Sequence, residues 1–452
     1  MWARPAYPRK VPEISTALSL KSSWRLRESS LTVAAIAALA ALLGLLGTYD
    51  FRLGILAAAL PLLVIGLAKP VACAIAGVAT TFYIVDASGG GLGIQVTFGD
   101  ALLLLAVGSA LATSVLKHRE PTVRLPPPLY LLIGVYLAVL VLVVVLNPGS
   151  HSIVDALHRV QVVGVAVVVG GFVLSGRALR QALGGYLLVT TVFAVAYAAV
   201  STGAGGLGIQ KNPAGQFIAV AVLLVLGTDV LGTWRFALLA PLSLGLFATG
   251  SRGALLGLGV GIAAQQLCGG QAPRWRTAAT LVPLALALGI GYAVLPQDSQ
   301  ERVGTFTTRG GATQSDMEAA STIKLRQDYR TDALRSIAAH PFTGVGVGQY
   351  IGGTVAKGTQ TNNPHNVVLL EAVEGGYPLA LASVALLVGS CVLVFRRRQQ
   401  TPLAAVALAV QVSTITHGMV DVYWVRGTPT LGWLLVGAAL ADAARRAKPA
   451  SG

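Results

Sequence analysis

Arg252 is a charged residue in a largely apolar chain, and its setting suggests a chemical role. It lies in the short link Gly250-Ser251-Arg252-Gly253 between two apolar segments. An arginine there is either an anchor that reaches the membrane interface or a ligand for an anion such as a phosphate. The flanking glycines favour the ligand, because glycine lets a backbone approach a bound molecule closely.

His365 is the second candidate, in Asn363-Pro364-His365-Asn366, where a polar stretch meets an apolar one. A surface histidine and a proton carrier fit this position equally well. Imidazole is the side chain best suited to move a proton near neutral pH. His365 is therefore a candidate general base, and Asn366 is a candidate to hold the imidazole ring or a sugar by hydrogen bonds.

Arg326 and Arg330 are four residues apart and share one face of a predicted helix. Their ordinary interpretation is a solvated helix face with salt bridges to Asp328 and Asp332. The functional interpretation is a fork for phosphate oxygens, which suits guanidinium geometry. Both interpretations stay open from the residues alone.

Weaker candidates fall at the predicted outer ends of apolar segments. Arg159 and Lys211 are possible substrate ligands, and His417 and Asp421, one helical turn apart, are possible members of a site. Asp229, placed inside an apolar segment, is predicted to serve packing or contacts between helices.

The composition indicates that a membrane positions these residues. Hydrophobic residues make up 54% of the 452 and charged residues only 11%, against roughly a quarter charged in soluble domains. The runs 101–116 and 131–146 are apolar on all sides, whereas a buried helix of a soluble protein keeps a polar face. The net charge of +15 is spread between apolar runs rather than gathered on one surface, so no nucleic-acid partner is predicted.

The apolar runs predict an all-α polytopic membrane protein with about 12–14 transmembrane helices. The fourteen predicted segments are residues 31–48, 52–68, 70–86, 97–116, 128–146, 160–175, 182–201, 213–231, 236–250, 253–270, 278–295, 376–395, 402–420 and 429–443.

Lys and Arg residues predict the orientation, because cytoplasmic loops retain positive charge. With the N-terminus inside, 21 of them lie on the cytoplasmic side, five in short outer loops and seven in one long outer loop. The predicted regions are a cytoplasmic tail at 1–30, transmembrane helices at 31–295, an extracytoplasmic loop at 296–365, a re-entrant segment with C-terminal transmembrane helices at 366–443, and a cytoplasmic tail at 444–452. The predicted location is a bacterial cytoplasmic (inner) membrane.

The long loop is predicted to carry structure of its own. Its first part, 297–321, is rich in Gly, Thr and Ser and is predicted to be mobile, and 322–339 has apolar residues every four positions, typical of an amphipathic helix. Pro341 is predicted to end that helix. A new spanning helix is predicted to start at Gly375-Gly376, after a short re-entrant or broken helix.

Five short motifs in this order resemble the O-antigen ligase and O-antigen polymerase superfamily, over about residues 210–395. They are Thr249-Gly250-Ser251-Arg252-Gly253-Ala254, Arg326-x-x-Tyr329, His340-Pro341-Phe342-Thr343-Gly344-Val345-Gly346, Pro364-His365-Asn366 and Glu374-Gly375-Gly376.

The resemblance implies a membrane-embedded glycosyltransferase that uses no metal, nucleotide or other cofactor. Such proteins pass a glycan from undecaprenyl diphosphate to an acceptor hydroxyl on the outer side of the membrane. By resemblance, Arg252 and Arg326 bind the diphosphate and His365 is the general base. Arg330, which shares a helix face with Arg326, is predicted as a further diphosphate ligand. The implied partners are the lipid-linked glycan donor, membrane lipids and an acceptor, either lipid A-core or a growing polysaccharide chain; a protein acceptor also stays open.

A secondary transporter or flippase is the alternative function, suggested by the many spans and by Asp229. Transporters usually show related halves with broken helices at the midplane, whereas here the polar features gather at one face. Uptake into proteoliposomes that depends on an ion gradient would support this alternative.

Overall fold

The computed structural model describes residues 69–81, 98–116, 125–201, 205–207, 209–268, 314–350, 363–421, 423–424 and 427–447. The chain divides into two units, Met1–Pro61 and Leu62–Gly452, and all described residues lie in the second. The predicted membrane segments 31–48, 52–68 and 278–295 lie outside the described residues.

The described elements are helices, apart from one antiparallel pair of two-residue strands. In chain order they are α3 (Pro70–Ala79), α4 (Phe98–Leu116), α5 (Pro127–Leu146), α6 (Ser150–Val160), η2 (Gln161–Val165), α7 (Ala166–Val168), η3 (Val169–Val173), α8 (Gly176–Val200), β1 (Gly205–Gly206), β2 (Ile209–Gln210), α9 (Lys211–Gly227), η4 (Gly232–Leu238), α10 (Leu239–Thr249), α11 (Arg252–Cys268), α14 (Gln314–Ala339), α15 (Val367–Arg396), α16 (Pro402–Val420) and α17 (Thr430–Ala447).

Within the described parts of the chain, six helices are long and apolar enough to cross a membrane. They are Phe98–Val115, Pro127–Leu146, His151–Val173, Gly176–Val200, Val367–Arg396 and Pro402–Val420. The exposed side chains of α5 include Leu131, Val135 and Val141, where a helix in water would place polar residues. The predicted class, an all-α polytopic membrane protein, is confirmed, and the total of 12–14 spans stays a prediction.

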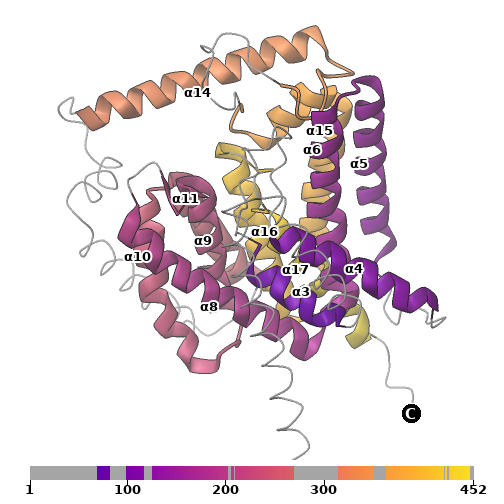
Figure 1. Cartoon of the computed structure of the whole chain (residues 1–452), viewed down its shortest axis with the longest axis vertical. Helices are drawn as coiled ribbons and strands as arrows, with labels where there is room; N and C mark the ends of the chain where they lie inside the picture. Colours follow the sequence, from indigo (N-terminus) through magenta and orange to yellow (C-terminus); the bar gives the residue numbers. More distant parts are fainter. Residues whose placement is uncertain are drawn as a thin grey trace, which may run out of the picture. The chain divides into compact units, whose positions relative to one another are not determined.

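Helix α16 contacts α9, α11, α15 and α17 (Figure 1). Small residues let membrane helices approach closely, and α11 meets α16 through glycines one turn apart. A Cβ at Gly257 would come within 2.7 Å of the carbonyl oxygen of Ser413, and one at Gly261 within 2.9 Å of that of Ala409. Because the two helices are antiparallel, the start of α11 lies beside the end of α16.

Helix α15 is broken at Gly375-Gly376, where the sequence predicts a break. Gly376 has a φ of +68°, and a Cβ there would lie 2.5 Å from the carbonyl oxygen of Pro341, so glycine alone fits. The amide of Tyr377, beyond the break, donates to that same oxygen at 2.7 Å. Irregular backbone in a membrane protein is tolerated when other groups satisfy it in this way.

The prediction for the long loop is partly wrong. Helix α14 begins at Gln314, eight residues before the predicted start at 322, so the end of the stretch predicted to be mobile, 314–321, is helical. Those eight residues include Met317, Glu318 and alanines, which favour helix. Residues 297–313 lie outside the described residues.

The apolar face of α14 packs on the first part of α15. Tyr329, Ala333 and Ile337 are buried, as the four-residue spacing predicts. Ala333 and Ile337 form a cluster with Val373, against which Tyr350 packs. Burial raises the pKa of Tyr350 to about 12, so its hydroxyl stays protonated and donates to the carbonyl oxygen of Tyr329 at 3.5 Å.

The predicted segment 160–175 begins too late. The helix runs from Ser150 to Val173 through two π-helical turns, η2 and η3. Arg159, predicted to lie in an outer loop, is therefore inside a helix. The sequence misleads because Asp155, His158 and Arg159 reduce the local hydrophobicity, although the arginine is buried and the histidine is partly buried.

Candidate functional site

Three ionisable side chains from three elements meet at the end of α16. Asp421 follows that helix and lies at the centre of the cluster, with its side chain only 5% exposed. One carboxylate oxygen, Oδ1, lies 3.2 Å from Nδ1 of His365, which precedes α15. The other, Oδ2, lies 3.6 Å from Nη2 of Arg326 on α14, whose Nη1 donates to the carbonyl oxygen of Val420 at 3.2 Å.

Local structure holds the His365 ring in this place. Its φ of +51° is unusual for a residue with a Cβ, and its amide donates to Oδ1 of Asn363 at 2.9 Å. The next residue, Asn366, caps α15 by accepting from the amide of Leu369, and its Nδ2 donates to the carbonyl oxygen of Met419 at 3.1 Å. The residues that begin α15 are thus fastened to the end of α16.

The contact with Asp421 determines what the His365 ring can do. An ionised carboxylate only accepts hydrogen bonds, so Nδ1 donates and Nε2 keeps its lone pair. The side chain is 23% exposed, so it is open to a substrate. The ring also stacks at 6.4 Å, centroid to centroid, with Tyr329 of α14. A histidine fixed in this tautomer is equipped to accept a proton from a hydroxyl.

Arg252 and Lys211 begin two helices at the same end of the bundle. Arg252 is exposed at the first position of α11, and a Cβ on the next residue, Gly253, would lie 2.9 Å from the ring of His417 on α16. Lys211 is exposed at the first position of α9. One turn later, a Cβ at Gly215 would lie 2.8 Å from the side chain of Ser251, just before α11.

The two arginines of α14 differ in their surroundings. Arg326 binds Asp421, so the predicted salt bridges within α14 do not account for it. Asp332 instead pairs with Arg335 at 3.1 Å. Arg330 is exposed, and none of the contacts between described residues brings it into the cluster at the end of α16.

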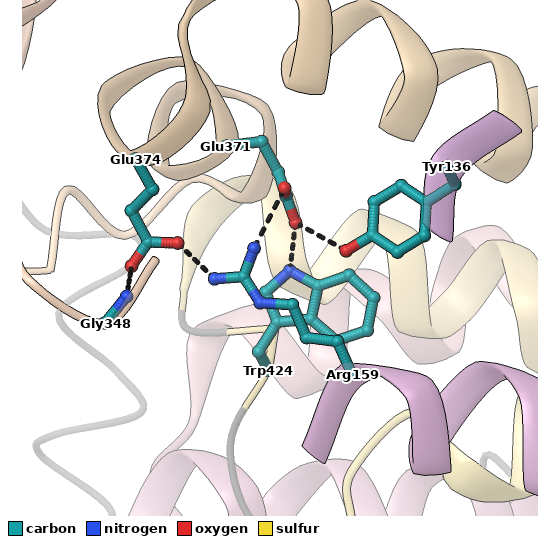
Figure 2. Close-up of polar contacts among 6 residues, drawn as sticks. All are labelled: Tyr136, Arg159, Gly348, Glu371, Glu374 and Trp424. Atoms are coloured by element: carbon teal, nitrogen blue, oxygen red, sulfur yellow. Dashed lines mark hydrogen bonds and ion pairs between the residues drawn. The ribbon is translucent and has the colours of Figure 1, made fainter. Parts of the chain in front are cut away.

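A second polar cluster surrounds Arg159 (Figure 2). Arg159 is 2% exposed, Glu371 0% and Glu374 4%. Nη1 of the guanidinium binds a carboxylate oxygen of Glu371 at 2.9 Å, and Nη2 binds Glu374. One cation thus joins two carboxylates that lie three residues apart on α15.

Neutral donors complete the second cluster. The indole of Trp424 and the hydroxyl of Tyr136 donate to Oε1 of Glu371, at 2.5 and 3.3 Å (Figure 2). The amide of Gly348 donates to Oε1 of Glu374 at 2.9 Å. Both carboxylates therefore keep hydrogen bonds in place of water, which a buried charge requires.

This geometry argues against the predicted role of Arg159 as a substrate ligand. Both terminal nitrogens of its guanidinium already bind carboxylates, and the side chain is only 3% exposed. The interpretation failed because it placed Arg159 at an outer helix end, whereas α6 and η2 carry it into the packed interior.

Sequence reasoning ranked Asp421 low and overlooked Trp424 and Tyr136. The four-residue spacing of His417 and Asp421 pointed to Asp421, since the structure puts both residues at the end of α16. Nothing in the sequence links Tyr136 to Glu371, because these residues are far apart in the chain and meet only through packing.

The fold and the first cluster define a class: a polytopic helical membrane protein with histidine, aspartate and arginine gathered at one end of its helices. A family model described as O-Antigen ligase matches residues 236–384. The match confirms the predicted resemblance to the O-antigen ligase and polymerase superfamily over these residues. No curated protein matches the chain. The family indicates an activity of the glycosyltransferase type.

The contact between Gly253 and α16 predicts that Gly253→Leu lowers transfer activity, because the added side chain pushes the start of α11, with Arg252, away from His417. Displacements of about 1 Å can cost about 100-fold in rate. Gly259→Leu is the matched control, since a Cβ there meets nothing within 4 Å. Transfer is measured on both purified variants; equal activity would show that this contact does not position Arg252.

Proposed function

We propose that the protein transfers a glycan from undecaprenyl diphosphate to an acceptor hydroxyl, without a metal or other cofactor. The observation that carries the proposal is the cluster at the end of α16, where a histidine held by Asp421 lies beside Arg326. A single displacement needs one base for the acceptor and charge stabilisation for the leaving diphosphate. The cluster offers both.

Arginines would stabilise the leaving group. As the sugar carbon is attacked, negative charge grows on the diphosphate, and guanidinium groups fixed beside it stabilise that charge. Arg326 keeps 40% of its side chain exposed despite its contact with Asp421. Arg252 supplies a second exposed guanidinium at the same end of the bundle. Arg330 and Lys211 remain candidates for further contacts, and Asn366 for a contact with the sugar.

His365 would act on the acceptor. Nε2 takes the proton from the attacking hydroxyl while Asp421, at Nδ1, stabilises the imidazolium that forms. The acceptor is lipid A-core or a growing polysaccharide chain. An assay of the purified protein with each acceptor in turn separates a ligase from a polymerase.

The opposite ends of α15 and α16 support the proposed orientation. Asn366 starts α15 and Asp421 follows α16 at the cluster, whereas α15 ends in Arg396, followed by two more arginines. Because positive charge is retained in the cytoplasm, we propose that the cluster faces away from it and that both termini are cytoplasmic.

The structure removes one of the two reasons for the transporter alternative, the predicted place of Asp229 inside the membrane. Asp229 was placed within a membrane segment, but α9 ends at Gly227 and Asp229 is exposed in the following turn. It therefore gives no support for an ion site inside the bundle.

Because His365→Ala removes the proposed base, it is expected to lower kcat for glycan transfer by about 100- to 10,000-fold, the usual contribution of general base catalysis. Arg326→Ala is expected to lower kcat as well, because it removes charge stabilisation that grows in the transition state. The measurement is transfer from a lipid-diphosphate glycan by the purified protein.

Two variants control for loss of an exposed histidine or arginine. His151→Ala removes an exposed histidine of α6, and Arg335→Ala removes an exposed arginine of α14. Both are expected to retain activity. Full activity in His365→Ala and Arg326→Ala would refute the proposed site.

The orientation predicts which cysteines a membrane-impermeant maleimide reaches in intact spheroplasts. A cysteine at exposed Thr331 of α14 is expected to react, and one at exposed Gln399, after α15, only once the membrane is opened. The three native cysteines are replaced by alanine beforehand. The reverse pattern would invert the orientation.

A further inference from the structure

The buried cluster around Arg159 includes groups from α15 and from the segments that follow α14 and α16 (Figure 2). His365 precedes α15, Arg326 lies on α14, and Asp421 follows α16. The first part of α15, the turn after α14 and the segment after α16 each place one or two groups in the network. These three connections explain how distant parts of the chain keep one arrangement.

The first connection holds the start of α15. Glu371 and Glu374 project from the same face of a short helical part, between the cap at Asn366 and the break at Gly375. A planar guanidinium that binds both carboxylates fixes the rotation of this part and its position along its axis. His365 directly precedes the cap, so its location follows from the same contact.

The second connection holds α14. After that helix the chain turns, and the amide of Gly348 donates to the Glu374 carboxylate at 2.9 Å. In the same turn, the amides of Val345 and Gly346 donate to the carbonyl oxygens of Val373 and Glu374, at 3.0 and 2.8 Å. The helix that bears Arg326 is thereby tied to the residues that Arg159 binds.

The third connection holds the segment after α16. Trp424, three residues beyond Asp421, donates to Glu371 at 2.5 Å and lies under the guanidinium, with Cζ of Arg159 5.4 Å from its ring. Tyr423 packs edge-on against Trp424 at 4.8 Å, and burial raises the pKa of its hydroxyl, which stays neutral. The position of Asp421 is therefore linked to Arg159 as well.

Stability alone is a weak reason for such a network. Taking one cation and two carboxylates out of water costs much of what their attraction returns, and apolar replacements are often as stable. Charged groups within membrane segments usually serve function. The gain that fits this arrangement is a single fixed geometry.

We propose that Arg159 is a positioning residue, which sets the places of His365, Arg326 and Asp421 without touching the substrate. Its effect on catalysis rests on the proposed function, whereas its effect on geometry does not. Arg159→Gln is expected to leave the start of α15 free to shift and to lower kcat by about 100-fold.

Disulfide trapping measures the geometry independently of activity. With the three native cysteines replaced by alanine, cysteines at Asn366 and Met419, whose parent residues share a hydrogen bond of 3.1 Å, are expected to cross-link readily. Arg159→Gln is expected to lower the cross-linked fraction several-fold. Arg335→Gln, which breaks the exposed ion pair of α14, is the matched control and leaves the fraction unchanged.

Arg159→Gln leaves two buried carboxylates without their cation, and this variant could fail to fold. A second variant therefore keeps the test decisive. The triple change Arg159→Met, Glu371→Gln and Glu374→Gln removes all three charges together. The proposal expects it to fold yet to show the same loss of cross-linking and of kcat. Wild-type cross-linking in the triple variant would overturn the proposal, whatever its activity.

Reduced cross-linking with unchanged kcat separates the two claims. It would confirm that Arg159 fixes the start of α15 and would contradict a catalytic role for the cluster at the end of α16. Normal cross-linking with a low kcat would instead leave the proposed function standing and refute positioning by Arg159.

Discussion

A buried guanidinium between two buried carboxylates is the constraint on which the rest of the structure depends. Arg159 lies inside a helix long and apolar enough to cross a membrane, where a charge must find partners within the protein. Its partners, Glu371 and Glu374, belong to the first part of α15. Those two ion pairs join that short part to the helix that carries Arg159, and the break at Gly375-Gly376 separates it from the rest of α15.

Close helix packing supplies the other half of the arrangement. Three glycines bring α11 against α16, so that Arg252 arrives where α16 ends. The turn after α14 fills the space at the break in α15 and bonds the backbone groups exposed there. In the proposed catalytic cluster, His365 and Asp421 lie at helix ends, whereas Arg326 reaches them from the middle of α14. Such an arrangement fixes side chains while His365 and Arg326 stay partly exposed.

The sequence predicted the membrane class and several site residues, but it could not predict contacts between distant parts of the chain. Apolar length predicted the membrane class, and the four-residue spacing of Tyr329, Ala333 and Ile337 predicted the buried face of α14. Arg252, Arg326 and His365 could be selected because polar groups are rare in this chain. The pairing of His365 with Asp421 could not be predicted, since it depends on how α15 and α16 meet. Arg159 was misplaced because local hydropathy cannot register a charge that distant carboxylates neutralise.

The most direct test of this account is a structure of the protein with a polyprenyl-diphosphate glycan bound. Diphosphate density is expected against the guanidinium groups of Arg252 and Arg326, with the sugar next to Nε2 of His365. The Arg159 pairs with Glu371 and Glu374 stay intact in that prediction. Diphosphate bound to Arg159 with those pairs broken, or bound away from the end of α16, would contradict the account.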